Sequence, residues 1–142
     1  KNVDDIQVTQ NSIVNNLGKF INDKNIYILD GHFALSTAYM NDCEPLLCFA
    51  QQVNGFGNAN DIFLGISTSG NSKNILFASI CAKAKGMKVI GLTGEKDSKL
   101  SEIADICIKA PSKETYMIQE YHLPIYHCLC LMLEDKFFGG CQ

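Results

Sequence analysis

Short apolar runs that alternate with helical patterns constrain the fold of this 142-residue chain more than any other feature. Each run is rich in isoleucine or valine and stops at turn-forming residues, as strands do. The runs cover residues 26–29, 61–66, 88–92 and 106–108. Strands of this kind, separated by helices, form parallel sheets that helices cover on both faces. The sequence therefore predicts an α/β fold with a helix-flanked parallel sheet.

Apolar side chains at helical spacing mark the segments between and around these runs. Four such segments are expected to be helices: residues 3–23, 71–85, 97–105 and 114–138. Residues 33–40 fit a helix or a strand equally well, and 55–60 is a turn cluster. Because no linker or repeat interrupts the pattern, we expect one domain over 1–142 with an α/β core at 25–110.

The charge and cysteine content exclude several classes of function. Twelve basic and fifteen acidic side chains give a net charge of −3 without a basic stripe, so direct nucleic-acid binding is not expected. No apolar run approaches the roughly 20 residues that span a bilayer, so a membrane partner is not expected either. Seven cysteines without a C-x-x-C pair fit buried thiols of a reducing cytosol. We therefore expect a cytoplasmic protein.

A hydroxyl-rich turn, here called the serine loop, follows the run at 61–66. It reads Ser67-Thr68-Ser69-Gly70-Asn71-Ser72. Ligands of open α/β sheets collect at this end of a strand, where the next helix also presents free N–H groups. Four hydroxyls suit phosphate oxygens, although Ser72 could instead cap the helix while the others serve the turn. Without a Walker ending here or a dinucleotide fingerprint at 55–60, no nucleotide cofactor is expected.

The expected C-terminal helix carries the side chains best suited to acid–base chemistry. Gln119 and His127 lie about 80° apart around its axis, so they could converge on one pocket. His122 is rotated further away and is expected to be structural or interfacial. Pro124 removes one N–H within the helix, and a kink there would alter how Gln119 and His127 converge.

Three segments together resemble the sugar isomerase (SIS) family: residues 62–74, 86–94 and 118–122. The string Ile-Gln-Glu-Tyr-His in the third, followed by a second histidine, is similar to the phosphoheptose isomerase group of that family. The resemblance runs from residue 41 to residue 133 and implies a flavodoxin-like three-layer sandwich. It also implies that four hydroxyl residues hold a sugar phosphate: Ser67, Thr68, Ser69 and Ser72.

The resemblance further implies an activity, the conversion of sedoheptulose 7-phosphate to D-glycero-D-manno-heptose 7-phosphate through an enediol. This is the first step of nucleotide-activated heptose biosynthesis. His127 then corresponds to the active-site histidine, Gln119 to a substrate or metal contact, and Asn41-Asp42 to a substrate-contacting pair. Some members of the group bind zinc, for which His32, Gln119 and His127 are the implied ligands. Homotetramers with sites at subunit interfaces are implied as well.

The chain departs from the phosphoheptose isomerase pattern after Gly31. The group carries a glycine- and serine-rich loop after the first strand, and a glutamate four residues after the histidine of a His-Phe-Ala triplet. Here Gly31 runs directly into His32, position 36 is serine, and Tyr116 stands where enteric-type members carry an acidic residue. Either the sequence omits mobile loops around His32, or the protein has lost this segment and its catalysis. The alternatives are an inactive SIS module, as sugar-phosphate binder or replication-initiator-binding scaffold, and an isomerase of another sugar phosphate.

Overall fold

The computed structural model describes residues 27–139, and the sheet in this part has three parallel strands. They are β1 (Ile62–Ile66), β2 (Lys88–Thr93) and β3 (Ile106–Lys109), in that order across the sheet. Leu64 pairs with Ile90, and Leu92 with Ile108, so all three carboxyl ends reach the same edge. The predicted parallel sheet is confirmed, whereas the predicted helix at 3–23 lies outside the described residues.

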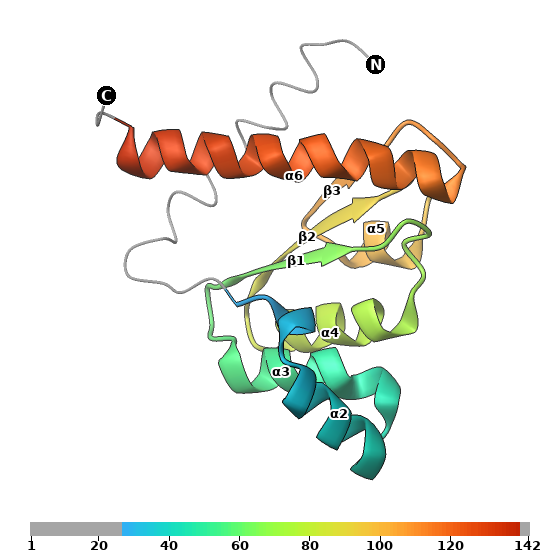
Figure 1. Ribbon diagram of the computed structural model, residues 1–142, viewed down its shortest axis with the longest axis vertical. Helices are drawn as coiled ribbons and strands as arrows, with labels where there is room; N and C mark the ends of the chain where they lie inside the picture. The colour runs from blue at the N-terminus through green and yellow to red at the C-terminus, as the bar shows by residue number, and fades with distance from the viewer. Residues whose placement is uncertain (1–26, 140–142) are drawn as a thin grey trace.

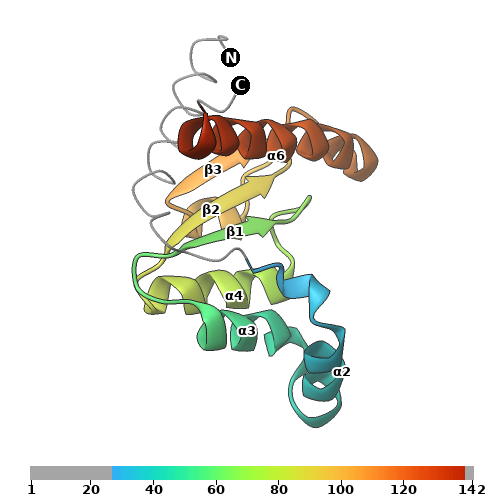
Figure 2. The same cartoon turned by 60° about the vertical axis from the view of Figure 1, so that its left-hand side comes forward.

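Five helices accompany the sheet in the described residues: α2 (Phe33–Asp42), α3 (Cys48–Phe56), α4 (Lys73–Ala84), α5 (Lys99–Ile103) and α6 (Thr115–Phe138). The 3-10 turns η1 (Leu29–Gly31) and η2 (Pro45–Leu47) precede α2 and α3. Figure 1 shows α6 along one face of the sheet and α4 with α3 on the other. The rotated view in Figure 2 agrees and places α2 on the α3 side, at the end of the molecule opposite α6. Helices therefore cover both faces, as predicted.

The two faces of the sheet bury different side chains because successive strand residues point to opposite faces. On one side, Val89 joins a core cluster with Leu76 of α4 and Leu100 of α5. On the other side, Ile90 packs against Leu129 of α6. Each face of β2 thus depends on its own helical layer.

The apolar run at 26–29 does not form a strand in its described part, so this prediction is wrong. Leu29–Gly31 is a 3-10 turn, and the Tyr27 ring stacks on the Phe56 ring of α3 at a centroid distance of 4.8 Å. A β-rich run becomes a strand only where a neighbouring strand pairs with it. This run packs against α3 instead, which leaves Ile28 68% exposed and β1 at the edge of the described sheet.

α6 continues through Pro124 and is 24 residues long. Only three of its side chains are buried: Ile118, His122 and Leu129. Proline lacks the N–H that an interior helical position donates, but contacts with the sheet hold the helix on both sides of Pro124. Neither α6 nor any other helix within residues 27–139 has the length and apolar character needed to cross a bilayer.

The Asp105 carboxylate stabilises the amino-terminal end of β2 by hydrogen bonds and ion pairs. Its carboxylate accepts hydrogen bonds from the Val89 N–H at 2.8 Å and the Lys83 ammonium at 2.9 Å, and the Lys88 ammonium lies 3.5 Å away. Desolvation is the largest single effect on the pKa of Asp105 and raises it, but the Val89 hydrogen bond and the two lysines together lower the pKa below its usual value. Folding therefore stabilises the charged carboxylate.

We predict that Asp105→Asn lowers the free energy of unfolding by about 1–2 kcal/mol at neutral pH, since it removes charge-assisted hydrogen bonds. Because the folded-state pKa is depressed, this stabilisation is present above the unfolded-state pKa and is lost as the pH falls through the folded-state value. Urea denaturation of both proteins should show the difference shrinking in acid.

Asp97→Asn is the control for this experiment. The Asp97 side chain is 92% exposed, so water screens its ion pair with Lys109 and little stability should be lost. A stability difference for Asp105→Asn that grows in acid would contradict the role given to this carboxylate.

Candidate functional site

Three loops meet beyond the carboxyl ends of the strands: residues 67–72, 94–98 and 110–114. Backbone hydrogen bonds join them. The Gly94 N–H donates to the Thr68 carbonyl at 3.0 Å, and the Glu95 N–H donates to the Ser112 carbonyl at the same distance. The serine loop is therefore held in a defined conformation at the edge where α/β sheets bind ligands.

Gly70 gives the serine loop its shape. Its N–H donates to the Ser67 carbonyl at 3.1 Å, which closes a turn. Its φ angle of +63° lies in the left-handed region that residues with a side chain disfavour. A Cβ at this position would also collide with the Ser98 side chain and would lie 3.1 Å from Thr93 Cγ2. Only glycine fits here.

The hydroxyl of Ser72 does not cap α4. Ser72 occupies the N-cap position, but its side chain makes no capping hydrogen bond, and its Oγ lies 2.9 Å from the Oγ of Ser67. The start of α4 therefore lacks this cap, and the positive end of the helix dipole faces the loop. This geometry argues against the interpretation that Ser72 serves only as a cap.

Asn71 ties the serine loop to α5, a role that the sequence pattern did not reveal. Its Oδ1 accepts the Lys99 N–H at 3.2 Å, and its Nδ2 donates to the Ser69 carbonyl at 2.9 Å. Ser69 Oγ accepts the Asn71 N–H at 3.2 Å. Asparagine is common in turns for local reasons, so no sequence signal separated this long-range contact from turn chemistry.

A pocket of about 270 Å³ opens beside the serine loop. Thr68, Ser69 and Thr115 line it with hydroxyls, Lys96 and Lys113 with positive charge, and Glu95 with one negative charge. A larger hollow of about 560 Å³ lies outside α4, but mainly apolar side chains line it and the serine loop does not border it. We place the candidate site at the smaller pocket, because its hydroxyls and ammonium groups suit an anionic ligand.

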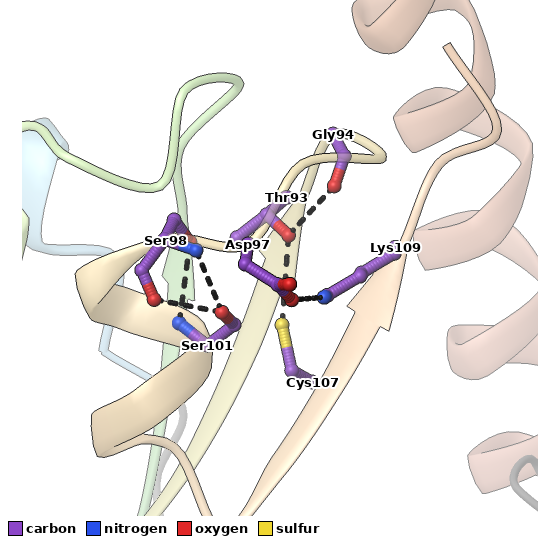
Figure 3. Close-up of polar contacts among 7 residues, drawn as sticks. All are labelled: Thr93, Gly94, Asp97, Ser98, Ser101, Cys107 and Lys109. Carbon is purple, nitrogen blue, oxygen red and sulfur yellow. Dashed lines mark hydrogen bonds and ion pairs between the residues drawn. The ribbon is translucent and has the colours of Figure 1, made fainter. Parts of the chain in front are cut away.

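Polar contacts fix the loop between β2 and α5 (Figure 3), which contributes residues to the lining of this pocket. Ser98 and Ser101 form a capping box at the start of α5, and the Lys109 ammonium binds the Asp97 carboxylate. The hydrogen bond and charge of Lys109 lower the pKa of Asp97, and the hydrogen bond to Asp97 raises the pKa of Lys109. Although Asp97 lines the pocket, its charge is already paired with that of Lys109.

Only two of the four residues predicted to bind phosphate line the pocket. Thr68 and Ser69 do, whereas Ser67 and Ser72 pair with each other elsewhere in the serine loop. All four belong to one short loop, so the structure keeps them together. Their role in binding stays a prediction.

The three candidate residues of α6 differ in burial. Gln119 and His127 are exposed and do not line the pocket beside the serine loop. His122 is only 4% exposed, and its Nε2 lies 3.1 Å from the Thr93 carbonyl oxygen. The structural position expected for His122 is confirmed, while the roles of the other two residues stay predictions.

The remaining predicted residues lie in α2 or directly before it. His32 precedes this helix and stacks on Phe56 at a centroid distance of 5.3 Å, and Asn41 and Asp42 are exposed at its end. Because α2 and α6 lie on opposite sides of the sheet (Figure 1), His32 and His127 do not meet within one chain. No group of three His, Cys, Asp or Glu side chains in the described part of the chain could hold a metal ion.

Sequence comparison identifies the family. The SIS domain family matches residues 13–94, more than half of the chain. The chain belongs to the SIS domain family. It is 45% identical over 103 residues to a phosphoheptose isomerase from Sulfurimonas denitrificans, and 44% identical over 105 residues to one from Aneurinibacillus thermoaerophilus. These matches cover 72% and 74% of this chain but 53% of each relative, so the chain spans about half the length of the curated relatives it matches.

Solved structures support the same family. A phosphoheptose isomerase from Francisella tularensis superposes with a TM-score of 0.74 at 35% identity, covering 89% of this chain and 72% of that one. One from Neisseria gonorrhoeae superposes with a TM-score of 0.74 at 30% identity, covering 87% and 70%. The Vibrio vulnificus NanR protein complexed with ManNAc-6P shares the fold alone, at 16% identity and a TM-score of 0.66, covering 92% and 55%. The expected SIS fold is confirmed.

We predict that Gly70→Ala destabilises the protein much more than Gly86→Ala. Both glycines have positive φ angles, +63° and +76°, so both substitutions strain the backbone. A Cβ at Gly86 would meet Ala59 at an ordinary 3.6 Å, whereas a Cβ at Gly70 would collide with Ser98. We expect a loss of about 1–2 kcal/mol for Gly86→Ala and more than about 3 kcal/mol for Gly70→Ala. Urea denaturation measures both, and equal losses would refute the close packing of the serine loop.

Proposed function

We propose that this chain isomerises sedoheptulose 7-phosphate to D-glycero-D-manno-heptose 7-phosphate, the first step of nucleotide-activated heptose biosynthesis. The observation that carries the proposal is the serine loop, where Ser67 and Ser72 pair at 2.9 Å beside the start of α4. The relatives described above support it because four of them are phosphoheptose isomerases. The six described cysteines are free thiols, which fits a cytoplasmic enzyme.

The serine loop would hold the phosphate end of the substrate. Its hydroxyls and the first N–H groups of α4 can donate hydrogen bonds to phosphate oxygens, and the helix dipole favours the negative charge. Among the residues that line the adjoining pocket, Lys96 and Lys113 add two positive charges and Glu95 one negative charge. This chemistry recognises a phosphate common to many sugars, so contacts elsewhere must select the seven-carbon chain.

The isomerisation moves one proton between adjacent carbons. A base removes a proton from the hydroxyl-bearing carbon next to the carbonyl while the carbonyl oxygen gains a proton, which gives an enediol. A proton is then added to the former carbonyl carbon, and the other hydroxyl loses its proton to become the new carbonyl. We assign one acid–base function to His127, because imidazole can accept and donate protons near neutral pH. The resemblance implies a glutamate for the other function, at position 36, where this sequence has serine. Gln119, on the same helix as His127, would bind substrate hydroxyls.

We predict that His127→Ala lowers kcat for sedoheptulose 7-phosphate by at least about 100-fold, the usual contribution of one acid–base group. The fold should survive, because the His127 side chain is exposed and its ring meets the Tyr126 ring in an edge-to-face arrangement. Glu134→Gln, an exposed substitution on the same helix, is the control and should leave kcat unchanged. Undiminished turnover by a folded His127→Ala protein would sink the assignment.

We propose further that the sites are completed between the subunits of a homotetramer. Large apolar side chains between 44% and 76% exposed line α6: Tyr116, Leu123, Leu131 and Phe138. Exposed apolar surface of this extent is typical of an interface. Zinc stays a proposal that depends on assembly, because His32 of the partner subunit would have to approach Gln119 and His127.

Sedimentation of the purified protein should therefore show a tetramer, and metal analysis should find about one zinc per subunit. Leu131→Glu should weaken the assembly by placing a charge on the apolar surface of α6. A monomer that turns over substrate after treatment with a chelator would contradict both parts of this proposal.

A second function is favoured by the contact at position 36. Gln52 is 1% exposed, and its Nε2 lies 3.3 Å from the Oγ of Ser36. A neutral serine, held by a buried amide, stands where the resemblance implies a catalytic glutamate. The alternative is therefore an inactive SIS module that binds a sugar phosphate or acts as a protein scaffold. Saturable binding of sedoheptulose 7-phosphate without turnover would decide for this alternative.

A further inference from the structure

His122 is the only polar side chain among the buried residues of α6. We infer that it is a positioning residue, which holds the end of β2, and with it the serine loop, in register with α6. This inference rests on the proposed function, since the serine loop is the proposed phosphate site. It assigns His122 a role beyond that of a satisfied core histidine.

The hydrogen bond of His122 defines its tautomer. Its Nε2 lies 3.1 Å from the Thr93 carbonyl oxygen, and a carbonyl oxygen only accepts hydrogen bonds, so Nε2 carries the hydrogen. The same oxygen accepts the Ala110 N–H at 2.8 Å. One buried acceptor thus joins three segments of the chain: the end of β2, the residues after β3 and the first half of α6.

The end of β2 at Thr93 contacts the serine loop at two points, once by a hydrogen bond and once by packing. The N–H of Gly94, the next residue, donates to the Thr68 carbonyl at 3.0 Å. Thr93 Cγ2 lies 3.1 Å from the place where a Cβ of Gly70 would be, so the Thr93 side chain packs closely on the Gly70 backbone. Figure 3 shows Thr93 and Gly94 at the end of β2, next to the start of α5. A shift of Thr93 therefore moves the serine loop.

α6 also contacts the end of β2 through an apolar side chain. A contact of this kind leaves the axial position of the helix open, so a directional contact is needed to set it. Ile118, one turn before His122, packs so closely on Gly94 that a Cβ there would lie 2.6 Å from its Cδ1. Apolar packing of this kind brings the helix close but does not select one axial position, because it is not directional. The hydrogen bond of His122 selects that position, and it thereby also places Gln119 and His127, which share the helix.

The experiment compares two substitutions of His122. His122→Leu replaces the imidazole by an apolar side chain and removes the donor, whereas His122→Gln keeps an N–H donor of similar reach. Binding of inorganic phosphate and of sedoheptulose 7-phosphate is measured by calorimetry well below the unfolding temperature of each protein. We expect His122→Leu to raise the Kd for both ligands about tenfold, and His122→Gln to stay within about threefold of the parent.

Asp105→Asn is the matched control, because it removes a polar contact at the opposite ends of the same strands. It should lower stability and leave both Kd values unchanged. If Asp105→Asn and His122→Leu weakened ligand binding equally, His122 would be a general stabilising residue, and the inference would be overturned. Parent-like binding by His122→Leu would overturn it as well.

Amide hydrogen exchange separates failure of this inference from failure of the proposed function. In the absence of ligand, His122→Leu should speed exchange of the Gly94 and Gly70 amides, whose acceptors are Thr68 and Ser67, about tenfold. His122→Gln should not. If the parent protein binds no sugar phosphate, the proposed function fails, but the exchange rates still test whether His122 positions the loop. Unchanged rates in His122→Leu would overturn the inference on their own.

Discussion

The carbonyl oxygen of Thr93 is the acceptor on which the arrangement of the carboxyl-end loops depends. It receives the Ala110 N–H from the segment after β3 and Nε2 of His122 from α6, while the adjacent Gly94 N–H reaches the serine loop. Apolar burial holds the helical layers against the sheet without fixing their relative positions closely. Hydrogen bonds depend on angle and distance, so these few contacts determine how the loops and α6 face each other.

The serine loop joins this fixed backbone to groups that are available for a ligand. Gly70 and Asn71 serve the conformation of the loop itself. Ser67 and Ser72 pair with each other, and Ser72 does not take the capping role that would occupy an N–H group of α4. The same N–H groups are those that bind an anion at a helix start. The local structure therefore favours a phosphate, whereas the choice of sugar depends on residues outside this loop.

Features set by residues close in the chain are predictable from this sequence, whereas contacts between distant segments are not. β1, β2 and β3 were predictable because each is a short apolar run that ends at turn residues. The run at 26–29 has the same composition, but its described part stacks on Phe56 of α3. Strand formation needs a pairing neighbour, and composition does not say which neighbour is available. Gln119 and His127 were placed on one helix correctly, but their surroundings depend on surfaces that periodicity does not describe.

The sequence by itself determined the helix-flanked parallel sheet and the position of the serine loop at its carboxyl edge. Both follow from side-chain periodicity and turn chemistry, which act over a few neighbouring residues. Only the tertiary structure decided that Ser72 pairs with Ser67 and that His122 reaches Thr93, 29 residues away in the chain. It also decided that α2 and α6 lie on opposite sides of the sheet. These outcomes depend on how distant segments pack, and local periodicity carries no information about that geometry.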